Sequence, residues 1–293
     1  MVEGIGFIGL GKMGTPILGN IMKKYDVKGV YNRTRTKSEP FGELGLRIYD
    51  SPGLLAANCN IVFTMLTDSE AVESVIFGPT GIYGYINSGS LVVDLSTIHP
   101  EKSREIAGRL AEKGVYFIDA PVIGSVQVAE KGELTIVAGG PKEVFERIRG
   151  VIETFGSNIF YMGENGSGLR MKLVNNMVMG ANLAVISEAL TFGQNLGIDP
   201  ENLIEVLASG AAGSNILDLK KESLLGGDFL PQFLLAHEYK DLNYAMDVAR
   251  RARSPVPIGS LSTQFYAAAM AIGLGNLDFS AVLRSFRALN GKA

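Results

Sequence analysis

Short apolar runs alternate with amphipathic segments through the first half of the chain. The runs that predict strands are Ile5–Ile8, Val27–Tyr31, Ile61–Met65, Leu91–Leu95, Val115–Ile118, Leu134–Ala138 and Ile159–Tyr161. Several of these runs are continuously apolar, which is typical of strands covered on both faces. Between them, apolar residues recur at helical spacing, as at Met13, Ile17 and Ile21, and Pro100 and Gly114 suit the two ends of another helix. This alternation predicts an α/β fold with a doubly wound, mainly parallel sheet.

The pattern changes after Gly163, where a segment rich in turn-forming residues precedes a long helical pattern. That pattern runs without proline from about Leu169 to Asn195, and apolar residues cover much of its circumference. Such a helix is central to its domain or lies in an interface between subunits. Later helices are separated by breaks at Gly210–Gly213, Gly226–Gly227, Pro255–Pro257 and Gly273–Asn276. We therefore predict an α/β domain over residues 1–163 and an all-α domain over residues 164–293, joined by the long central helix.

Composition and charge exclude several classes of protein. Apolar residues make up 46% of the 293 residues, which is enough to form buried cores, so disorder is not expected. The formal net charge is −3 and no basic stripe stands out, so we expect no nucleic-acid partner. The single cysteine, Cys59, cannot form a disulfide within the chain, which indicates a reducing compartment. We expect Cys59 to be a small buried hydrophobe.

Metal and membrane sites are not expected either. The two histidines, His99 and His237, are far apart in the sequence and have no ligand spacing. No stretch of about 18 consecutive apolar residues occurs, and no charged segment followed by an apolar stretch opens the chain. We therefore expect a cytoplasmic protein without a signal peptide.

A glycine motif lies directly after the first predicted strand and before the first predicted helix. It reads Gly9-Leu10-Gly11-Lys12-Met13-Gly14. In this position the first glycine permits a tight turn, the second lets the backbone approach a pyrophosphate, and the third lets the helix pack closely on the strand. The first amides of the helix then face the phosphates. The sequence therefore predicts a dinucleotide site on a Rossmann domain, and we include Met65 and Leu66, where the third apolar run ends, among the cofactor contacts.

The end of the second predicted strand indicates which dinucleotide is bound. An NAD enzyme usually has Asp or Glu there, bonded to the ribose hydroxyls. This chain instead continues with Asn32, Arg33 and Thr34, and Lys37 follows. A guanidinium suits a 2′-phosphate, and the neighbouring side chains can add donors. We therefore predict NADP rather than NAD as the cofactor, with a solvated basic turn as the alternative interpretation.

Three further segments point to a reacting centre. Ser96 and Thr97 lie at the end of a predicted strand, where ligands of such sheets bind. The turn Ile123-Gly124-Ser125 follows another strand, and its amides can hold a carboxylate. Lys172 and Asn176 are four residues apart, so on a helix they share one face, roughly 6 Å apart along the axis. Lys172 can supply the proton of a carbonyl reduction if burial lowers its pKa, although a helix lysine is more often a solvated surface residue.

At this point the chain resembles the β-hydroxyacid dehydrogenase family, which includes 3-hydroxyisobutyrate dehydrogenases and glyoxylate/succinic semialdehyde reductases. The motifs that carry the resemblance are Gly6–Gly14, Asn32–Thr34, Asp119–Val122, Gly166–Asn176 and Lys240–Leu242. The resemblance implies a Rossmann domain, a helical C-terminal domain, and subunits that associate as a homodimer or homotetramer. It also implies a catalytic Lys172, a substrate contact from Asn176, Thr97 and Lys240 near the nicotinamide, and Phe233 over the cofactor.

One departure from the family concerns the substrate. The family commonly has Asp-Ala-Pro-Val-Ser-Gly-Gly, whereas Ile123 replaces the serine here and Ser125 replaces the last glycine. Backbone amides of Gly124 and Ser125 remain as carboxylate donors, and the Ser125 hydroxyl can substitute for the lost one. The resemblance thus implies NADP-dependent hydride transfer to or from a small β-hydroxy acid or its semialdehyde. Alternatives are a glyoxylate/succinic semialdehyde reductase, a dehydrogenase of serine-like acids, an imine reductase, and a non-catalytic NADP-binding module.

Overall fold

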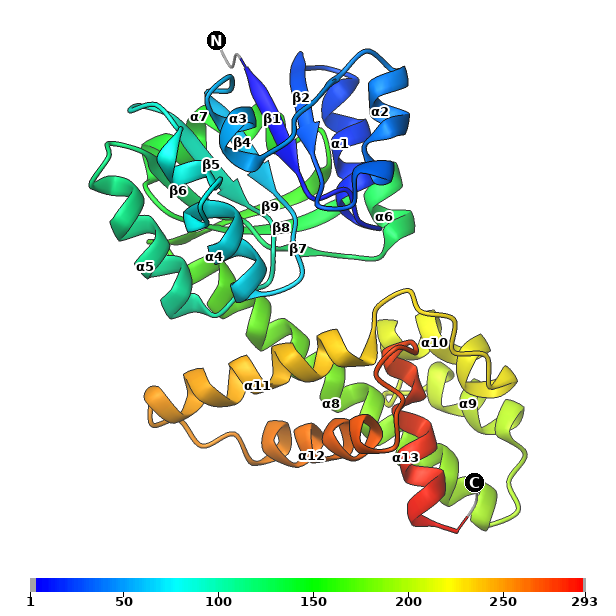
Figure 1. Cartoon of the computed structure of the whole chain (residues 1–293). Helices are drawn as coiled ribbons and strands as arrows, with labels where there is room; N and C mark the ends of the chain where they lie inside the picture. Colours follow the sequence, from blue (N-terminus) through cyan, green and yellow to red (C-terminus); the bar gives the residue numbers. More distant parts are fainter. Residues whose placement is uncertain (1–3, 292–293) are drawn as a thin grey trace. The chain divides into compact units, whose positions relative to one another are not determined.

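A nine-stranded sheet lies at the centre of the N-terminal half in the computed structural model, which describes residues 4–291 (Figure 1). Its strands are β1 (Ile5–Ile8), β2 (Val27–Tyr31), β3 (Arg47–Ile48), β4 (Ile61–Thr64), β5 (Leu91–Asp94), β6 (Tyr116–Asp119), β7 (Val122–Ile123), β8 (Leu134–Gly139) and β9 (Gly156–Gly163). They are ordered β3-β2-β1-β4-β5-β6-β8-β7, and β9 pairs with β8. The pairs of β8 with β6 and β7 are antiparallel and the others are parallel, as expected for a mainly parallel sheet.

Helices cover both faces of this sheet. They are α1 (Gly14–Met22), α2 (Glu39–Glu43), α3 (Pro52–Ala56), α4 (Ser69–Phe77), α5 (Pro100–Ala111), α6 (Val126–Lys131) and α7 (Lys142–Ile152). Successive strand residues point to opposite faces, so Phe63 joins the apolar cluster beneath α1 and α7 while Val62 joins the cluster beneath α3, α4 and α5. Both strand side chains are fully buried. The continuous apolar runs therefore reflect a sheet with a core on each side.

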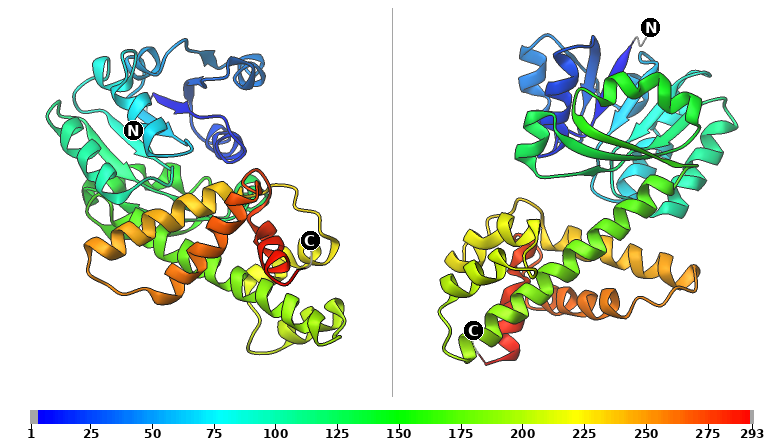
Figure 2. Two further views of the ribbon diagram at one scale, coloured as in Figure 1. Left: turned by 60° about the horizontal axis from the view of Figure 1, so that its bottom comes forward. Right: turned by 180° about the vertical axis from the view of Figure 1, so that it is seen from behind.

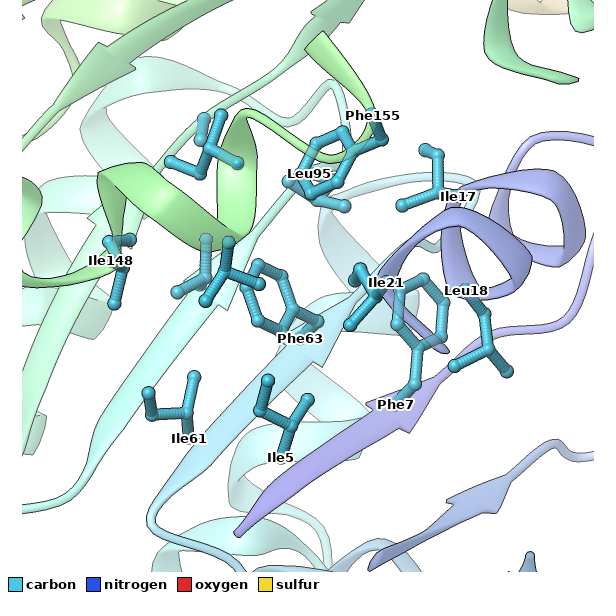
Figure 3. Close-up of a cluster of buried hydrophobic side chains, with 14 of the residues drawn as sticks. Ile5, Phe7, Ile17, Leu18, Ile21, Ile61, Phe63, Leu95, Ile148 and Phe155 are labelled. Carbon is cyan, nitrogen blue, oxygen red and sulfur yellow. The ribbon is translucent and has the colours of Figure 1, made fainter. Parts of the chain in front are cut away.

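Aromatic rings organise the first of these clusters (Figure 3). The rings of Phe7 and Phe63, from neighbouring strands, are stacked with their centroids 6.3 Å apart. Phe155 meets Phe63 edge-on, also at 6.3 Å. Ile17 and Ile21, one turn apart on α1, pack against the same cluster. The 3.6-residue spacing of the helix and the two-residue spacing of the strands thus meet in one core.

The C-terminal half is helical. It contains α8 (Ser167–Asn195), α9 (Pro200–Ser209), α10 (Asn215–Gly226), α11 (Leu235–Arg251), α12 (Pro257–Ala271) and α13 (Val282–Leu289). The predicted breaks fall at helix ends: Asp199 caps α9 by accepting from the amide of Asn202, and Pro257 is the first residue of α12. Gly197 and Gly227 adopt positive φ angles after α8 and α10, a conformation that favours glycine. The prediction of an all-α second half is therefore confirmed.

Helix α8 is the longest element, about 44 Å from end to end. Figure 2 shows it running without a break from the sheet-bearing half into the helical half. The chain divides into two compact units, Met1–Lys172 and Leu173–Ala293, so the division falls inside this helix. The predicted division between residues 163 and 164 stays a prediction, because α8 contributes residues to both units.

The apolar surface of α8 is used in two ways. Leu183, Ile186 and Leu190 are buried in the core of the helical unit. By length and composition alone the helix could cross a membrane, and 44% of its most apolar window is buried within the structure. Other apolar side chains of the same helix are more than half exposed, including Phe192 and Val185. Association of subunits through this surface stays a prediction.

Two short strands were not predicted from the sequence. β3 and β7 have two residues each, and β3 is only partly buried, so neither gives a run of apolar residues. By contrast, Cys59 matches its prediction. It is 2% exposed, and burial raises the pKa of its thiol to about 12. Gly6 lies close by, because a Cβ there would be 2.8 Å from the sulfur of Cys59.

A buried ion pair fixes the loop before α11. The ammonium of Lys220 lies 2.9 and 3.0 Å from the two carboxylate oxygens of Asp278, and these side chains are 6% and 1% exposed. Asp278 also accepts from the amides of Gln232 and Phe233 and from the hydroxyl of Ser280. Burial raises the pKa of Asp278, but these hydrogen bonds and the Lys220 charge outweigh it, so the pKa lies below its ordinary value.

We predict that Asp278→Asn lowers the free energy of unfolding by about 3–5 kcal/mol, because it leaves the Lys220 ammonium buried without its counter-charge. The loss should shrink in acid below about pH 4, because Asp278 contributes its full stability above the pKa of the unfolded chain and loses it as the pH falls through its lower pKa in the folded chain. Urea unfolding at several pH values measures both effects.

The control for this prediction is Asp26→Asn, which removes the carboxylate of the exposed pair with Lys28. It should cost no more than about 1 kcal/mol. Equal losses for the two variants would contradict the role assigned to burial.

Candidate functional site

The carboxyl ends of the central parallel strands bring the predicted cofactor residues of the sheet-bearing half to one edge of the sheet. Ile8, Thr64 and Asp94 are the last residues of β1, β4 and β5, and they are aligned with one another. The segments that follow these strands hold the glycine motif, Met65-Leu66 and Ser96-Thr97. Sequence spacing alone could not show this alignment, which is a consequence of the strand order.

The glycine loop fits a phosphate group. Gly9 has a φ angle of 102°, and a Cβ there would be 2.2 Å from the carbonyl oxygen of Met65. A Cβ on Gly14 would be 1.9 Å from the carbonyl oxygen of Gly9, so helix and strand meet at a distance that only glycine permits. At Gly11, by contrast, a Cβ would meet nothing within 4 Å, so the backbone faces open space where a pyrophosphate can approach. The motif therefore has the geometry of a dinucleotide cradle.

Side chains at this edge hold the loops in place. The Asn32 side-chain oxygen accepts from the amide of Leu10 at 2.9 Å, and its amide group donates to the carbonyl of Thr34. The hydroxyl of Ser96 accepts from the amide of Leu66 at 2.8 Å and donates to Asp94 at 2.6 Å. Ser96 is fully buried, which favours a role in fixing the loop. Its predicted contact with substrate stays a prediction.

Basic side chains follow β2, as predicted for the cofactor's adenine end. Arg33, Thr34 and Lys37 are exposed. Arg35 forms an exposed ion pair with Asp50, at 2.6 Å between nitrogen and oxygen. Asp50 lies beyond β3, and its contact with this turn could not be predicted from the sequence. The arrangement leaves the guanidinium of Arg33 facing solvent at the end of β2.

The segment that departs from the family pattern is a tight turn. Ile123 ends β7 and is half-buried, and Gly124 has a φ angle of 143°. The hydroxyl of Ser125 accepts from the amide of Val128 at 3.4 Å and so caps α6. The hydroxyl that the sequence offers as a substitute for the missing serine is therefore also a helix cap. The predicted contact of Ile123, Gly124 and Ser125 with a substrate stays a prediction.

Asp119, the last residue of β6, has no exposed surface. Its carboxyl accepts from the amides of Gly166 and Leu169 and from the hydroxyl of Ser103. Burial raises its pKa to about 7, and the hydrogen-bond donors offset only part of that effect. The sequence motif contained this residue but gave no sign of its partners, which come from 16, 47 and 50 residues away.

Lys172 and Asn176 lie one turn apart on α8, as predicted. Lys172 is half-buried and Asn176 is fully buried. The amide of Asn176 donates to Asp241 at 2.7 Å, and Asp241 also lies 3.1 Å from the ammonium of Lys240. Asp241 was the unrecognised partner here, since the sequence pointed only to the lysine beside it. This contact fixes the orientation of the Asn176 amide.

Phe233 precedes α11 and is held by its neighbours. Its amide donates to Asp278 at 3.2 Å, and its ring meets Phe279 edge-on, with the ring centroids 5.6 Å apart. The buried pair of Asp278 with Lys220 therefore also determines the position of this aromatic residue. The predicted contacts of Phe233, Lys240 and Thr97 with a cofactor stay predictions.

Two family models together cover nearly the whole chain. A model described as the NAD binding domain of 6-phosphogluconate dehydrogenase matches residues 4–163. A second, described as the NAD-binding domain of NADP-dependent 3-hydroxyisobutyrate dehydrogenase, matches residues 166–286. The first match coincides with the sheet-bearing half and the second with the helical half.

Related proteins include enzymes and a nuclear factor. A 2-(hydroxymethyl)glutarate dehydrogenase of Eubacterium barkeri is 33% identical over 98% of this chain and 96% of its own length. The chloroplastic glyoxylate/succinic semialdehyde reductase 2 of Arabidopsis thaliana is 35% identical over 98% of this chain and 80% of its own length. The human cytokine-like nuclear factor N-PAC is 33% identical over 96% of this chain, which corresponds to 51% of that longer protein.

Solved structures share the fold. The 3-hydroxyisobutyrate dehydrogenase of Mycobacterium tuberculosis, solved with L-serine, has a TM-score of 0.87 and 29% identity, and the match covers 98% of this chain and all of that one. A structure of Psf3 with NADP⁺ and 2-OPP has a TM-score of 0.85 and 28% identity, over 96% and 99% of the two chains. Both solved structures therefore share the fold of this chain, which has a Rossmann-like domain and a helical domain.

We predict that Gly14→Ala weakens dinucleotide binding, because the new methyl group would force α1 away from the carbonyl of Gly9. The matched control is Gly19→Ala on the same helix, where a Cβ would meet nothing within 4 Å. That variant should keep its affinity and gain about 0.5–1 kcal/mol in unfolding free energy. Fluorescence titration with NADPH and thermal unfolding measure these effects. Similar affinity losses in both variants would contradict the cradle.

Proposed function

Because this chain belongs to the β-hydroxyacid dehydrogenase family of NAD(P)-dependent oxidoreductases, we propose that it transfers a hydride between NADP and a small β-hydroxy acid or the corresponding semialdehyde. The observation that carries the proposal is the buried contact of Asn176 with Asp241, one helical turn beyond Lys172. This contact supports a fixed orientation for the Asn176 amide, and the resemblance assigns the chemistry to Asn176 and Lys172.

In this proposal Lys172 moves the proton. The nicotinamide, when bound, supplies or accepts the hydride. During reduction, the ammonium of Lys172 donates a proton to the substrate carbonyl oxygen, which becomes a hydroxyl group. During oxidation, the neutral amine accepts the hydroxyl proton. Asn176 orients the substrate with its amide, and Asp241 prevents that amide from turning away.

A preference for NADP is supported by the residues after β2. Arg33 is exposed there, and no carboxylate occupies the position that would bind ribose hydroxyls in an NAD enzyme. Asp50, whose carboxylate lies beside this turn, forms an ion pair with Arg35. The related structure with NADP⁺ gives further support.

The substrate class follows from the relatives and from Ile123. The enzymes reported above are named for 2-(hydroxymethyl)glutarate, glyoxylate, succinic semialdehyde and 3-hydroxyisobutyrate, and each of these molecules has a carboxylate and an alcohol or carbonyl group. In this chain Ile123 removes a hydroxyl from the segment proposed to hold the carboxylate. We propose that the chain prefers acids with an apolar substituent over acids with an extra hydroxyl or amine.

A non-catalytic dinucleotide-binding module is the second candidate. The relative named as a nuclear factor favours it, because that protein is as similar in sequence as the dehydrogenase. The two candidates differ in one measurement: NADPH oxidation in the presence of a panel of C2 to C6 oxo acids and semialdehydes. Nucleotide binding without turnover on any of them would favour the module.

We predict that Lys172→Ala lowers kcat by at least about 100-fold, because general acid–base catalysis typically contributes 10²–10⁴-fold. The Kd for NADPH should stay within about twofold, since this side chain moves a proton and is not proposed to bind phosphate. Steady-state kinetics and fluorescence titration measure the two quantities. Arg170→Ala, which removes a partly exposed cation of the same helix that lies near Glu101, is the matched control. A fully active Lys172→Ala variant would exclude Lys172 as the acid–base group.

We predict that Arg33→Ala raises the Kd for NADPH by about 10-fold to 100-fold and leaves the Kd for NADH nearly unchanged. The reason is that a hydrogen bond to a charged group contributes about 1.5–3 kcal/mol, and only NADPH carries the 2′-phosphate. Arg35→Ala is the control, because that guanidinium is paired with Asp50. Equal losses for both cofactors in Arg33→Ala would refute the assignment.

A further inference from the structure

The first turn of α8 is bonded to the end of β6 through one side chain. Oδ1 of Asp119 accepts from the amide of Gly166 at 2.7 Å, and Oδ2 accepts from the amide of Leu169 at 3.2 Å. The hydroxyl of Ser103, on α5, donates to Oδ1 at 3.1 Å. Amides at the start of a helix have no partners within the helix, so this buried carboxyl satisfies two of them.

We propose that Asp119 is a positioning residue for Lys172: its carboxyl fixes where α8 begins on the sheet, and thereby fixes the place of the lysine amine. The inference rests on the proposed function of Lys172. The inference adds that Asp119, at the end of β6, determines the position of the Lys172 amine together with α8 itself.

Glycines let the helix approach this carboxyl closely. A Cβ on Gly168 would be 2.3 Å from the carbonyl oxygen of Val137 and 3.0 Å from Oδ2 of Asp119. A Cβ on Gly139 would be 2.9 Å from the same carboxyl oxygen and 2.9 Å from the amide of Gly168. The strand end and the helix start thus meet backbone to backbone. If the carboxyl contact is lost, the backbone at Gly139 and Gly168 has to shift, because glycines have no side chain that could move instead.

The approach to the helix is held at further points. Gly166 has a φ angle of 87°, which turns the chain into the helix, and the side chain of Asn165 donates to the carbonyl of Phe117 at 2.9 Å. The amide of Gly140 donates to the carbonyl of Gly163. These contacts tether the segment before the helix, whereas the helical amide of Leu169 is held by Asp119.

The distance from the anchor to the lysine is short. Lys172 lies five residues after Ser167, about 7.5 Å along the axis, and α8 is regular over this span. If the first turn of α8 is displaced, the Lys172 amine is therefore displaced by a similar distance. Misplacing a catalytic group by about 1 Å can cost about 100-fold in rate. The proposal thus predicts a large effect on turnover from a residue that touches neither substrate nor cofactor.

The test uses Asp119→Asn in the full chain at about pH 8, where the wild-type carboxyl, whose pKa is about 7, is ionised and accepts through both oxygens. The amide side chain can accept through one oxygen only, so either Gly166 or Leu169 loses its acceptor. Two readouts are taken well below the unfolding temperature: amide hydrogen exchange over residues 165–173, and kcat with the Kd for NADPH. We expect exchange in this segment to become at least about 10-fold faster, kcat to fall at least about 10-fold, and the Kd to stay within about twofold.

The control is Asp199→Asn, which makes the same substitution at an exposed carboxylate that caps the start of α9 by accepting from the amide of Asn202. It should leave exchange over residues 165–173 and kcat unchanged. If Asp119→Asn does not fold, Ser103→Ala replaces it, because it removes only the hydroxyl donor to the same carboxyl. Smaller changes in the same direction are expected from that variant.

The outcomes separate this proposal from the proposed function. Faster exchange together with a lower kcat supports positioning. Unchanged exchange, or faster exchange with wild-type kcat, overturns it, because then the anchor does not determine the place of the amine. If the wild type turns over no substrate, the proposed function fails. The exchange measurement still decides whether Asp119 holds the first turn, and unchanged exchange would again overturn the anchor.

Discussion

The buried carboxyl of Asp119 joins the carboxyl end of β6 to the first turn of the longest helix, because it accepts from the amides of Gly166 and Leu169. The two α8 side chains to which the proposed chemistry is assigned lie beyond this first turn. Lys172 and Asn176 follow within three turns of the same helix, and the proposal is that the start of this helix determines where the lysine amine lies.

Two buried aspartates of this chain show how their partners determine charge. Asp278 lies against the ammonium of Lys220, and its pKa is held below the ordinary value. Asp119 receives neutral donors, and burial raises its pKa to about 7. Asp278 therefore gives stability that is lost in acid. Asp119 has the opposite effect: between about pH 4 and pH 7 it is protonated in the folded chain and ionised in the unfolded chain. The free energy of unfolding therefore falls as the pH rises through that window.

The sequence predicted the elements well wherever a pattern extended over several residues. Strands such as β1 and β2 and the helix breaks at glycine and proline were found at their observed positions. The two-residue strands β3 and β7 were missed, because they contain too few residues for any periodicity. Of the candidate site, the glycine loop and the one-turn spacing of Lys172 and Asn176 could be predicted, since both depend on local geometry alone.

The partners of those residues could not be predicted. Asp241 for Asn176, Asp50 for Arg35 and Leu66 for Ser96 lie 15 to 65 residues away along the chain. Such pairs arise from strand order and helix packing, which no short motif specifies. The same limit applies to Asp119: a motif can identify the residue, but its partners follow only from the three-dimensional arrangement of α5, β6 and α8.

The burial of Cys59 has a practical consequence for spectroscopy. Its thiol is 2% exposed and its pKa is about 12, so at neutral pH almost none of it is the reactive thiolate. Because the sequence contains no other cysteine, one introduced at an exposed position can be coupled to a fluorophore selectively. Cys59 therefore does not need to be replaced before labelling, and fluorescent probes can be attached at exposed positions of either unit.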